Sequence, residues 1–169
     1  MDSATSGPNS SQNHSQKTSI AAGRAFGAAS TLVAQMGILL GMIVSQQAQS
    51  ALVVASAASA VSGSFGDAFS MFISESTAKR EAFTAASSVL VSKLGIGTLY
   101  VLLFFLVGKN HPLTLVLAIT LTLTLLYILS LQMVKEGESN WPTFTNFVIL
   151  TILVVSVTSG FGFFIRRAL

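Results

Sequence analysis

The stretch "ALVVASAASAVSGSFGDAFSMFI", residues 51–73, decides the fold of this chain. Apart from Asp67 it consists of apolar and small residues, and a helix of about twenty such residues is long enough to cross the hydrocarbon core of a bilayer. Four more segments of this kind lie at residues 26–44, 83–107, 113–133 and 144–165. The sequence therefore predicts an all-α membrane protein whose five transmembrane helices form a compact bundle in the lipid bilayer.

The composition supports a membrane protein and argues against several other classes. The 169 residues are 51% hydrophobic and only 9% charged, with a mean hydropathy of +0.72, whereas soluble domains are about one-quarter charged. The net charge of +3 is not concentrated in a basic cluster, so nucleic acid is not an expected partner. The chain has no Cys, and its only histidines are His14 and His111, which argues against thiol chemistry, a zinc hydrolase or a histidine triad. We expect neither an enzyme nor a bound cofactor.

The polar N-terminal segment differs in composition from the rest of the chain. Residues 1–22 are rich in Ser, Asn and Gln and cannot bury enough apolar surface to fold alone, so we predict a disordered tail. No basic region leads directly into an apolar core, which argues against a signal peptide. The remaining residues, 23–169, are predicted to form the five-helix transmembrane domain.

The distribution of Lys and Arg predicts the orientation in the membrane. Short cytoplasmic loops carry an excess of these residues, so the richer side is assigned to the cytoplasm. With the N-terminus cytoplasmic, the inner side holds Lys17, Arg24, Lys79, Arg80 and Lys135, and the outer side holds Lys109, Arg166 and Arg167. We therefore expect a cytoplasmic N-terminus and a C-terminus on the opposite side.

Small residues recur every three or four positions along the first predicted helix. They are Gly23, Gly27, Ser30, Ala34, Gly37, Gly41 and Ser45. In lipid, such a stripe lets two helix backbones approach closely. The sequence therefore predicts a homodimer joined along the first helix, with the first two helices forming the functional interior.

Three residues near the end of the second predicted helix could hold a divalent metal. Asp67, Met71 and Glu75 follow one another at intervals of four residues, so they lie close to one face of a helix. A carboxylate inside a membrane costs about 3 kcal/mol and normally faces a bundle interior or a watery path. Carboxylate oxygens suit hard divalent cations, and a thioether adds a softer contact that Fe²⁺ or Mn²⁺ tolerates.

Structural interpretations of the same residues stay open. Glu75 is close to the predicted helix end, where it could pair with Lys79 at the interface. Asp67 could form a structural ion pair with Lys93, and Met71 could simply pack. Lys93 could also reach the membrane interface, or neutralise a carboxylate when no metal is bound.

These residues resemble the vacuolar iron transporter family, which includes the nodulin-like transporters of plants. The first helix of that family reads like L-G-x-N-D-G-L-V after an Arg, and "RAFGAASTLVAQMGILLG", residues 24–41, is similar to it. The second helix of the family ends like E-A-I-S-M-x-x-G-E-Y-x-x-x-K. Here "DAFSMFISESTAK", residues 67–79, places Asp67 and Glu75 at the two acids and Met71 at the methionine. The last helix of the family, Gly-rich before basic residues, is similar to "VTSGFGFFIRR", residues 157–167.

The resemblance implies a five-helix dimer that moves Fe²⁺ or Mn²⁺ out of the cytosol, in exchange for protons, across a vacuolar or other organelle membrane. The metal is then the transported substrate, with Asp67, Met71, Glu75 and Ser30 as its ligands. The chain departs from the family in three ways. Ser30 stands where the family has an Asp on the path. The Pro residues of the family's third helix are absent and Lys93 is present, and the acidic cytosolic extension between the second and third helices is missing.

Two functions therefore follow from the sequence. The first is a transporter of Fe²⁺ or Mn²⁺, which accounts for the acids, the methionine and the small-residue stripe. The second is a non-transporting assembly or scaffold subunit of the same fold, which accounts for Ser30 in place of the acid and for Lys93. The two differ in whether transport requires Asp67.

Overall fold

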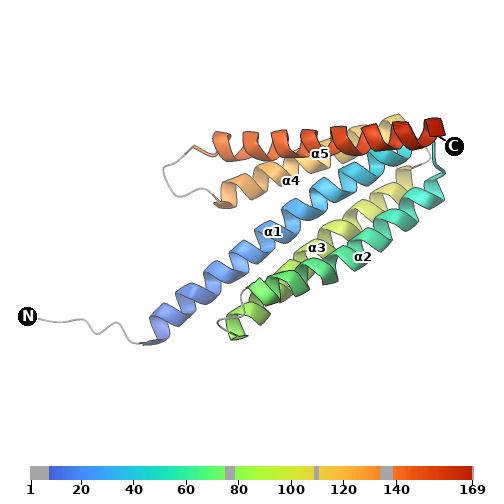
Figure 1. Ribbon diagram of the computed structural model, residues 1–169. Coiled ribbons are helices and arrows are strands. Elements are labelled where there is room, and N and C mark those ends of the chain that lie inside the picture. The colour runs from blue at the N-terminus through green and yellow to red at the C-terminus, as the bar shows by residue number, and fades with distance from the viewer. Residues whose placement is uncertain (1–7, 75–78, 109–110, 134–138, 169) are drawn as a thin grey trace, which may run out of the picture.

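The computed structural model describes residues 8–74, 79–108, 111–133 and 139–168, and these form five long helices (Figure 1). Each is long and apolar enough to cross a membrane, which confirms the predicted all-α membrane fold. The helices are α1 (Pro8–Val44), α2 (Gln49–Ser74), α3 (Lys79–Val107), α4 (His111–Met133) and α5 (Trp141–Ala168).

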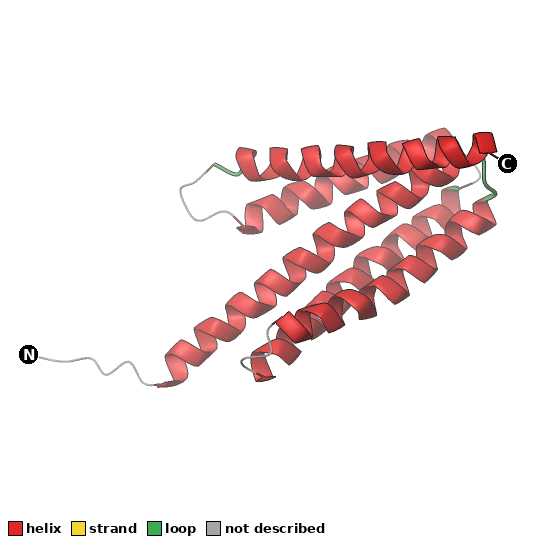
Figure 2. Cartoon of the chain, viewed as in Figure 1, coloured by secondary structure: helices red, strands yellow, loops and turns green. Residues whose placement is uncertain are grey.

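The helices run up and down, and α1 lies between two pairs of neighbours. Figure 1 shows α2 and α3 on one side of α1 and α4 and α5 on the other, with the two chain termini at opposite ends of the bundle. Within the described residues, α1 contacts all four other helices, whereas α2 packs only on α1 and α3. Figure 2 shows that the described connections between helices are short loops. This topology makes α1 the central helix of the bundle.

Helix α1 begins at Pro8, well before the apolar span that starts at Gly23. Residues 8–22 were expected to belong to a disordered tail, and residues 1–7 of that tail lie outside the described part of the chain. A helix that is already nucleated by its packed apolar span grows at little cost per residue. Pro8 fits the first position of a helix, where its missing N–H removes no hydrogen bond.

The small-residue stripe of α1 packs against other helices of the same chain. A Cβ on Gly27 would lie 2.8 Å from the Val89 carbonyl oxygen of α3 and would also overlap Ser92. Further along α1, a Cβ on Gly37 would lie 3.2 Å from Thr158 Oγ1 of α5. The sequence predicted close approach of backbones along this stripe correctly, but these glycines have partners within the protomer. The dimer stays a prediction.

The core gathers around the middle of α1 and the ends of α2 and α3. Its largest fully buried side chains are Leu32, Leu39, Leu52, Tyr100, Phe104 and Leu126. Hydrogen bonds between buried side chains cross this core at two places. Tyr100 Oη and Thr122 Oγ1 lie 2.5 Å apart between α3 and α4, and Gln35 of α1 bonds reciprocally with Ser56 of α2. Because lipid gives apolar helices little reason to associate, such buried polar contacts help to fix which helix faces which.

The turn between α1 and α2 closes with a left-handed residue. Gln46 has a φ of 57°, and its N–H donates to the Ile43 carbonyl, while the N–H of Gln47 donates to the Met42 carbonyl. These two bonds form a Schellman motif, in which the left-handed position usually belongs to Gly. Gln46 therefore holds a backbone conformation that costs an ordinary residue about 1–2 kcal/mol.

Candidate functional site

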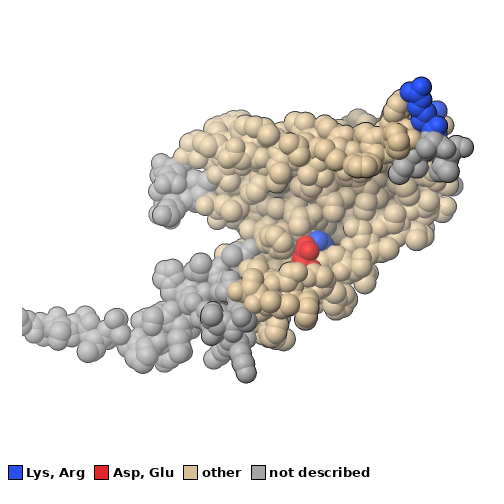
Figure 3. Space-filling view, viewed as in Figure 1, with Lys and Arg blue, Asp and Glu red and all other residues tan. Residues whose placement is uncertain are grey.

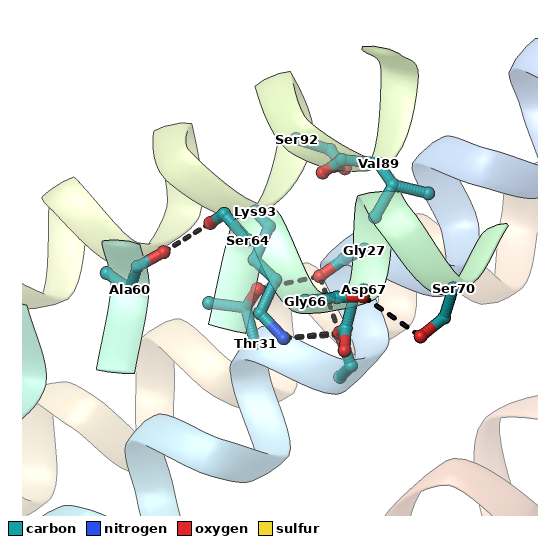
Figure 4. Close-up of polar contacts among 11 residues, drawn as sticks. Gly27, Thr31, Ala60, Ser64, Gly66, Asp67, Ser70, Val89, Ser92 and Lys93 are labelled. Atoms are coloured by element: carbon teal, nitrogen blue, oxygen red, sulfur yellow. Dashed lines mark hydrogen bonds and ion pairs between the residues drawn. The ribbon is translucent and has the colours of Figure 1, made fainter. Parts of the chain in front are cut away.

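Three polar side chains from three helices, Ser30, Asp67 and Lys93, meet inside the bundle, and Figure 4 shows the last two. Asp67 of α2 and Lys93 of α3 point toward one another, and Lys93 Nζ lies 2.5 Å from Asp67 Oδ2. Ser30 Oγ of α1 donates to the same Oδ2 at 3.0 Å, and Lys93 Nζ lies 3.2 Å from Ser30 Oγ. Each of the three residues thus contacts both others. We call this group the Ser30–Asp67–Lys93 cluster.

Close packing of the helices makes room for the cluster. A Cβ on Gly63 of α2 would lie 3.1 Å from Cε and 3.2 Å from Nζ of Lys93, so the absent side chain leaves the lysine space to lie along α2. On the other side, Gly27 lets α1 approach α3 one turn before Ser30. Gly27, from the predicted small-residue stripe of α1, and Gly63 of α2 therefore both help the lysine to reach the carboxylate.

The two charged side chains differ in exposure. The Lys93 side chain is 7% exposed, whereas that of Asp67 is 29% exposed. Figure 3 shows the acidic group in a hollow of the surface with the basic group beside it. Both recorded hydrogen bonds to the Asp67 carboxylate end on Oδ2, and among the described residues none ends on Oδ1. The acid thus faces outward with one oxygen unused, and the lysine lies behind it.

The pairing explains how two charges can stay within the membrane-spanning segments. An unpaired charge at that depth is costly, but a close ion pair with an added hydroxyl donor offsets much of the desolvation. Of the alternatives open for Lys93, the structure shows the ion pair between its ammonium group and Asp67. The cluster is neutral as a whole, so its chemistry depends on whether another cation can take the place of the ammonium.

The predicted metal ligands are only partly brought together. Ser30 and Asp67 are in contact, as expected if Ser30 faces the acid. Met71 is half-buried one turn further along α2, with its Sδ 3.9 Å from Ser74 Oγ. Glu75 lies outside the described residues. The structure finds no group of three or more His, Cys, Asp or Glu side chains within its described part. The four-residue ligand set stays a prediction.

One polar contact near the cluster escaped the sequence analysis. Gln35 and Ser56 are fully buried, and their hydrogen bonds join α1 to α2. Gln35 follows Ser30 along α1, and Ser56 precedes Asp67 along α2. A glutamine in the middle of an apolar span could have signalled such a contact, because a buried amide requires a hydrogen-bonding partner. The serine gave no signal, since serine also serves as a small residue in helix packing.

Comparisons of the chain with family models, with curated proteins and with solved structures give no match.

Proposed function

We propose that the chain is a transporter of a divalent metal, Fe²⁺ or Mn²⁺, with the Asp67 carboxylate at its cation-binding site. The observation that carries this proposal is the Asp67–Lys93 ion pair inside the membrane-spanning segments. Ionisable groups at such depth are rare and typically mark ion or substrate pathways. In this proposal the Lys93 ammonium neutralises Asp67 while the site is empty.

Metal binding would require the carboxylate to exchange partners. Within the described part of the chain, no group donates a hydrogen bond to Asp67 Oδ1, which can meet an arriving cation, while Ser30 Oγ lies within reach as a neutral oxygen ligand. Displacement of the ammonium from Oδ2 would then offer both carboxylate oxygens to the metal. Met71 and Glu75 are proposed as further ligands, and loss of a proton from the displaced Lys93 ammonium would balance one of the two incoming charges.

The setting of this activity is part of the proposal. We place the protein in a vacuolar or other organelle membrane, with its N-terminus in the cytoplasm and with metal moving out of the cytosol. Asn9 and Asn13 each begin an Asn-x-Ser sequence, the acceptor pattern for N-glycosylation on the lumenal side. Glycosylation of either residue in a eukaryotic host would therefore contradict that orientation. We also propose that the protein is a homodimer. The molar mass of the detergent-solubilised protein tests this. Because Gly27 and Gly37 pack inside the protomer, a dimer contact along α1 would involve its other residues.

A scaffold or assembly subunit is the second candidate, and one observation favours it. Asp67 and Lys93 pair with each other and both contact Ser30, as a purely structural link between α1, α2 and α3 would require. In that case the charges would fix helix positions and would not bind a substrate.

Metal uptake into proteoliposomes separates the two candidates. The purified chain should take up Fe²⁺ or Mn²⁺ more readily than Zn²⁺, and Asp67→Asn should abolish uptake because it removes the charge and keeps the shape. Ser70→Ala is the control, since the Ser70 side chain is exposed and its hydroxyl donates to the Gly66 carbonyl of its own helix. Uptake that survives in Asp67→Asn would place the pathway elsewhere, and absence of uptake for all three metals would favour the scaffold.

A further inference from the structure

Gly63 of α2 lies beside the end of the Lys93 side chain. A Cβ at Gly63 would lie 3.1 Å from Lys93 Cε and 3.2 Å from Lys93 Nζ, and among the described residues it would meet no other atom of a neighbouring helix within 4 Å. A glycine at a contact between helix backbones is different. A Cβ at Gly97 of α3 would lie 2.5 Å from the Cβ and 3.4 Å from the Cα of Ala60 on α2. The space at Gly63 therefore accommodates the lysine and does not serve a close approach of two backbones.

The Lys93 ammonium group lies next to both Gly63 and Asp67, which are about one helical turn apart on α2. Its Nζ is 2.5 Å from Asp67 Oδ2 and 3.2 Å from Ser30 Oγ. Hydrogen bonds between an ammonium group and a carboxylate are about 2.7–2.9 Å long, so Nζ has no room to move closer to Oδ2. A side chain at position 63 would push the flexible lysine end away by a few tenths of an ångström, because ordinary contacts begin at 3.4 Å. That movement lengthens or bends the bond to Asp67.

A cation from outside the protein must compete with this ammonium group for Asp67. The lysine is tethered to α3, so it is present next to the carboxylate at a fixed and high effective concentration. The Asp67 side chain is 29% exposed and that of Lys93 only 7%, so an incoming cation meets a carboxylate that already holds the lysine. How well the ammonium group fits on Asp67 Oδ2 therefore determines how tightly another cation can bind there.

We infer that Gly63 is a positioning residue of the cation site, which sets how strongly Lys93 competes with an incoming cation for Asp67. Gly63 acts through the lysine and not on the metal. The inference rests on the proposed function for its consequence, a change in metal affinity. It does not rest on that function for the position of Lys93, which can be measured without metal.

Equilibrium binding of Mn²⁺ to the full chain in lipid nanodiscs tests the consequence, with free Mn²⁺ measured by electron paramagnetic resonance and empty nanodiscs subtracted. Lys93→Met keeps a long side chain without the charge and should bind Mn²⁺ at least about tenfold more tightly, the value of one charge-assisted hydrogen bond. Gly63→Ala should bind about threefold more tightly, because it weakens that bond without removing it. Gly66→Ala is the matched control on the same helix, since a Cβ there meets no atom within 4 Å. It should leave the affinity unchanged.

The double variant Gly63→Ala with Lys93→Met separates positioning of the lysine from helix packing. Its added Cβ still meets a long side chain but no ammonium group. We expect the double variant to bind Mn²⁺ as tightly as Lys93→Met alone, so that the effect of Gly63→Ala disappears. A threefold gain that persists without the lysine would overturn the inference, because Gly63 would then act through packing. Misfolding does not imitate the expected result, since the expected result is a gain of affinity.

The reaction of Asp67 with dicyclohexylcarbodiimide, an apolar carboxyl reagent, tests the position of Lys93 without metal. Mass spectrometry of the adduct measures its rate. Lys93 protects Asp67, so we expect the fastest reaction in Lys93→Met, an intermediate rate in Gly63→Ala, and the wild-type rate in Gly66→Ala. Unchanged Mn²⁺ affinity in Gly63→Ala, when the wild-type chain binds Mn²⁺, would overturn this inference alone. A faster reaction in Gly63→Ala, when the wild-type chain binds no Mn²⁺, would refute the metal site and support the positioning of Lys93 by Gly63.

Discussion

A close contact between α1 and α3 at Gly27 gives a sharp test of how α1 is packed. Gly27→Ala adds a Cβ that would lie 2.8 Å from the Val89 carbonyl oxygen, whereas ordinary contacts begin at 3.4 Å. The difference between these distances, 3.4 minus 2.8, requires α1 and α3 to separate by roughly 0.6 Å, an overpacking that costs about 1–3 kcal/mol. The gain from replacing Gly by Ala inside a helix, about 0.5–1 kcal/mol, offsets part of this cost. We therefore expect a net loss of about 1–2 kcal/mol in the free energy of unfolding.

Unfolding in mixed micelles with increasing denaturing detergent measures this loss. Gly95→Ala is the matched control, because a Cβ there meets no atom within 4 Å and the same residue change should stabilise α3. Gly27→Ala as stable as Gly95→Ala would refute the close α1–α3 packing. A variant that keeps its stability but loses a dimer would show that the small-residue stripe joins two copies instead.

Three further predictions follow from single contacts. Gln46→Gly should raise the free energy of unfolding by about 1 kcal/mol, since glycine adopts the left-handed φ of 57° without a penalty, and an unchanged thermal midpoint would contradict this. Gln35→Ala should lower the free energy of unfolding by about 1–3 kcal/mol because it leaves the buried Ser56 hydroxyl without its amide acceptor. A smaller loss than that caused by Gln47→Ala, at an exposed residue, would contradict this prediction. Met71→Leu should change the ratio of Fe²⁺ to Mn²⁺ uptake with little change in their sum, and an unaltered ratio would remove Met71 from the ligand set.

The helices were predictable from the sequence because each span carries its own signal. Apolar length alone set the second span at residues 51–73, and the structure extends it only to Gln49–Ser74. The ends were less predictable. Pro8 begins α1 within a polar segment whose composition suggested disorder, since composition does not register that a neighbouring packed helix can be extended.

The sequence predicted which residues form the candidate site better than it predicted how they contact one another. Asp67 and Lys93 are conspicuous because charges are rare in apolar spans, and their pairing was one of the alternatives that the sequence left open. The role of Gly63 could not be predicted, because its significance is the space that it leaves beside the lysine stem. The partners of the α1 glycines could not be predicted either. A small residue indicates that a backbone comes close but does not identify which helix supplies it.

The ion pair also shows why loss of uptake in Asp67→Asn must be measured together with the stability of that variant. Removing either charge leaves the other buried without a partner, which costs about 3–5 kcal/mol for a buried pair and less here because Asp67 is 29% exposed. A single variant can therefore lose activity by misfolding. The double variant Asp67→Asn with Lys93→Met removes both charges, keeps similar side-chain volumes and should fold as stably as the wild-type chain.

Metal uptake by this double variant tests the central claim most directly, namely that the Ser30–Asp67–Lys93 cluster is a cation site and not only a tie between helices. The account predicts a double variant with wild-type stability in detergent and no uptake of Fe²⁺ or Mn²⁺ into proteoliposomes. A double variant that takes up metal at the wild-type rate would contradict it, because the cluster would then serve only to hold α1, α2 and α3 together.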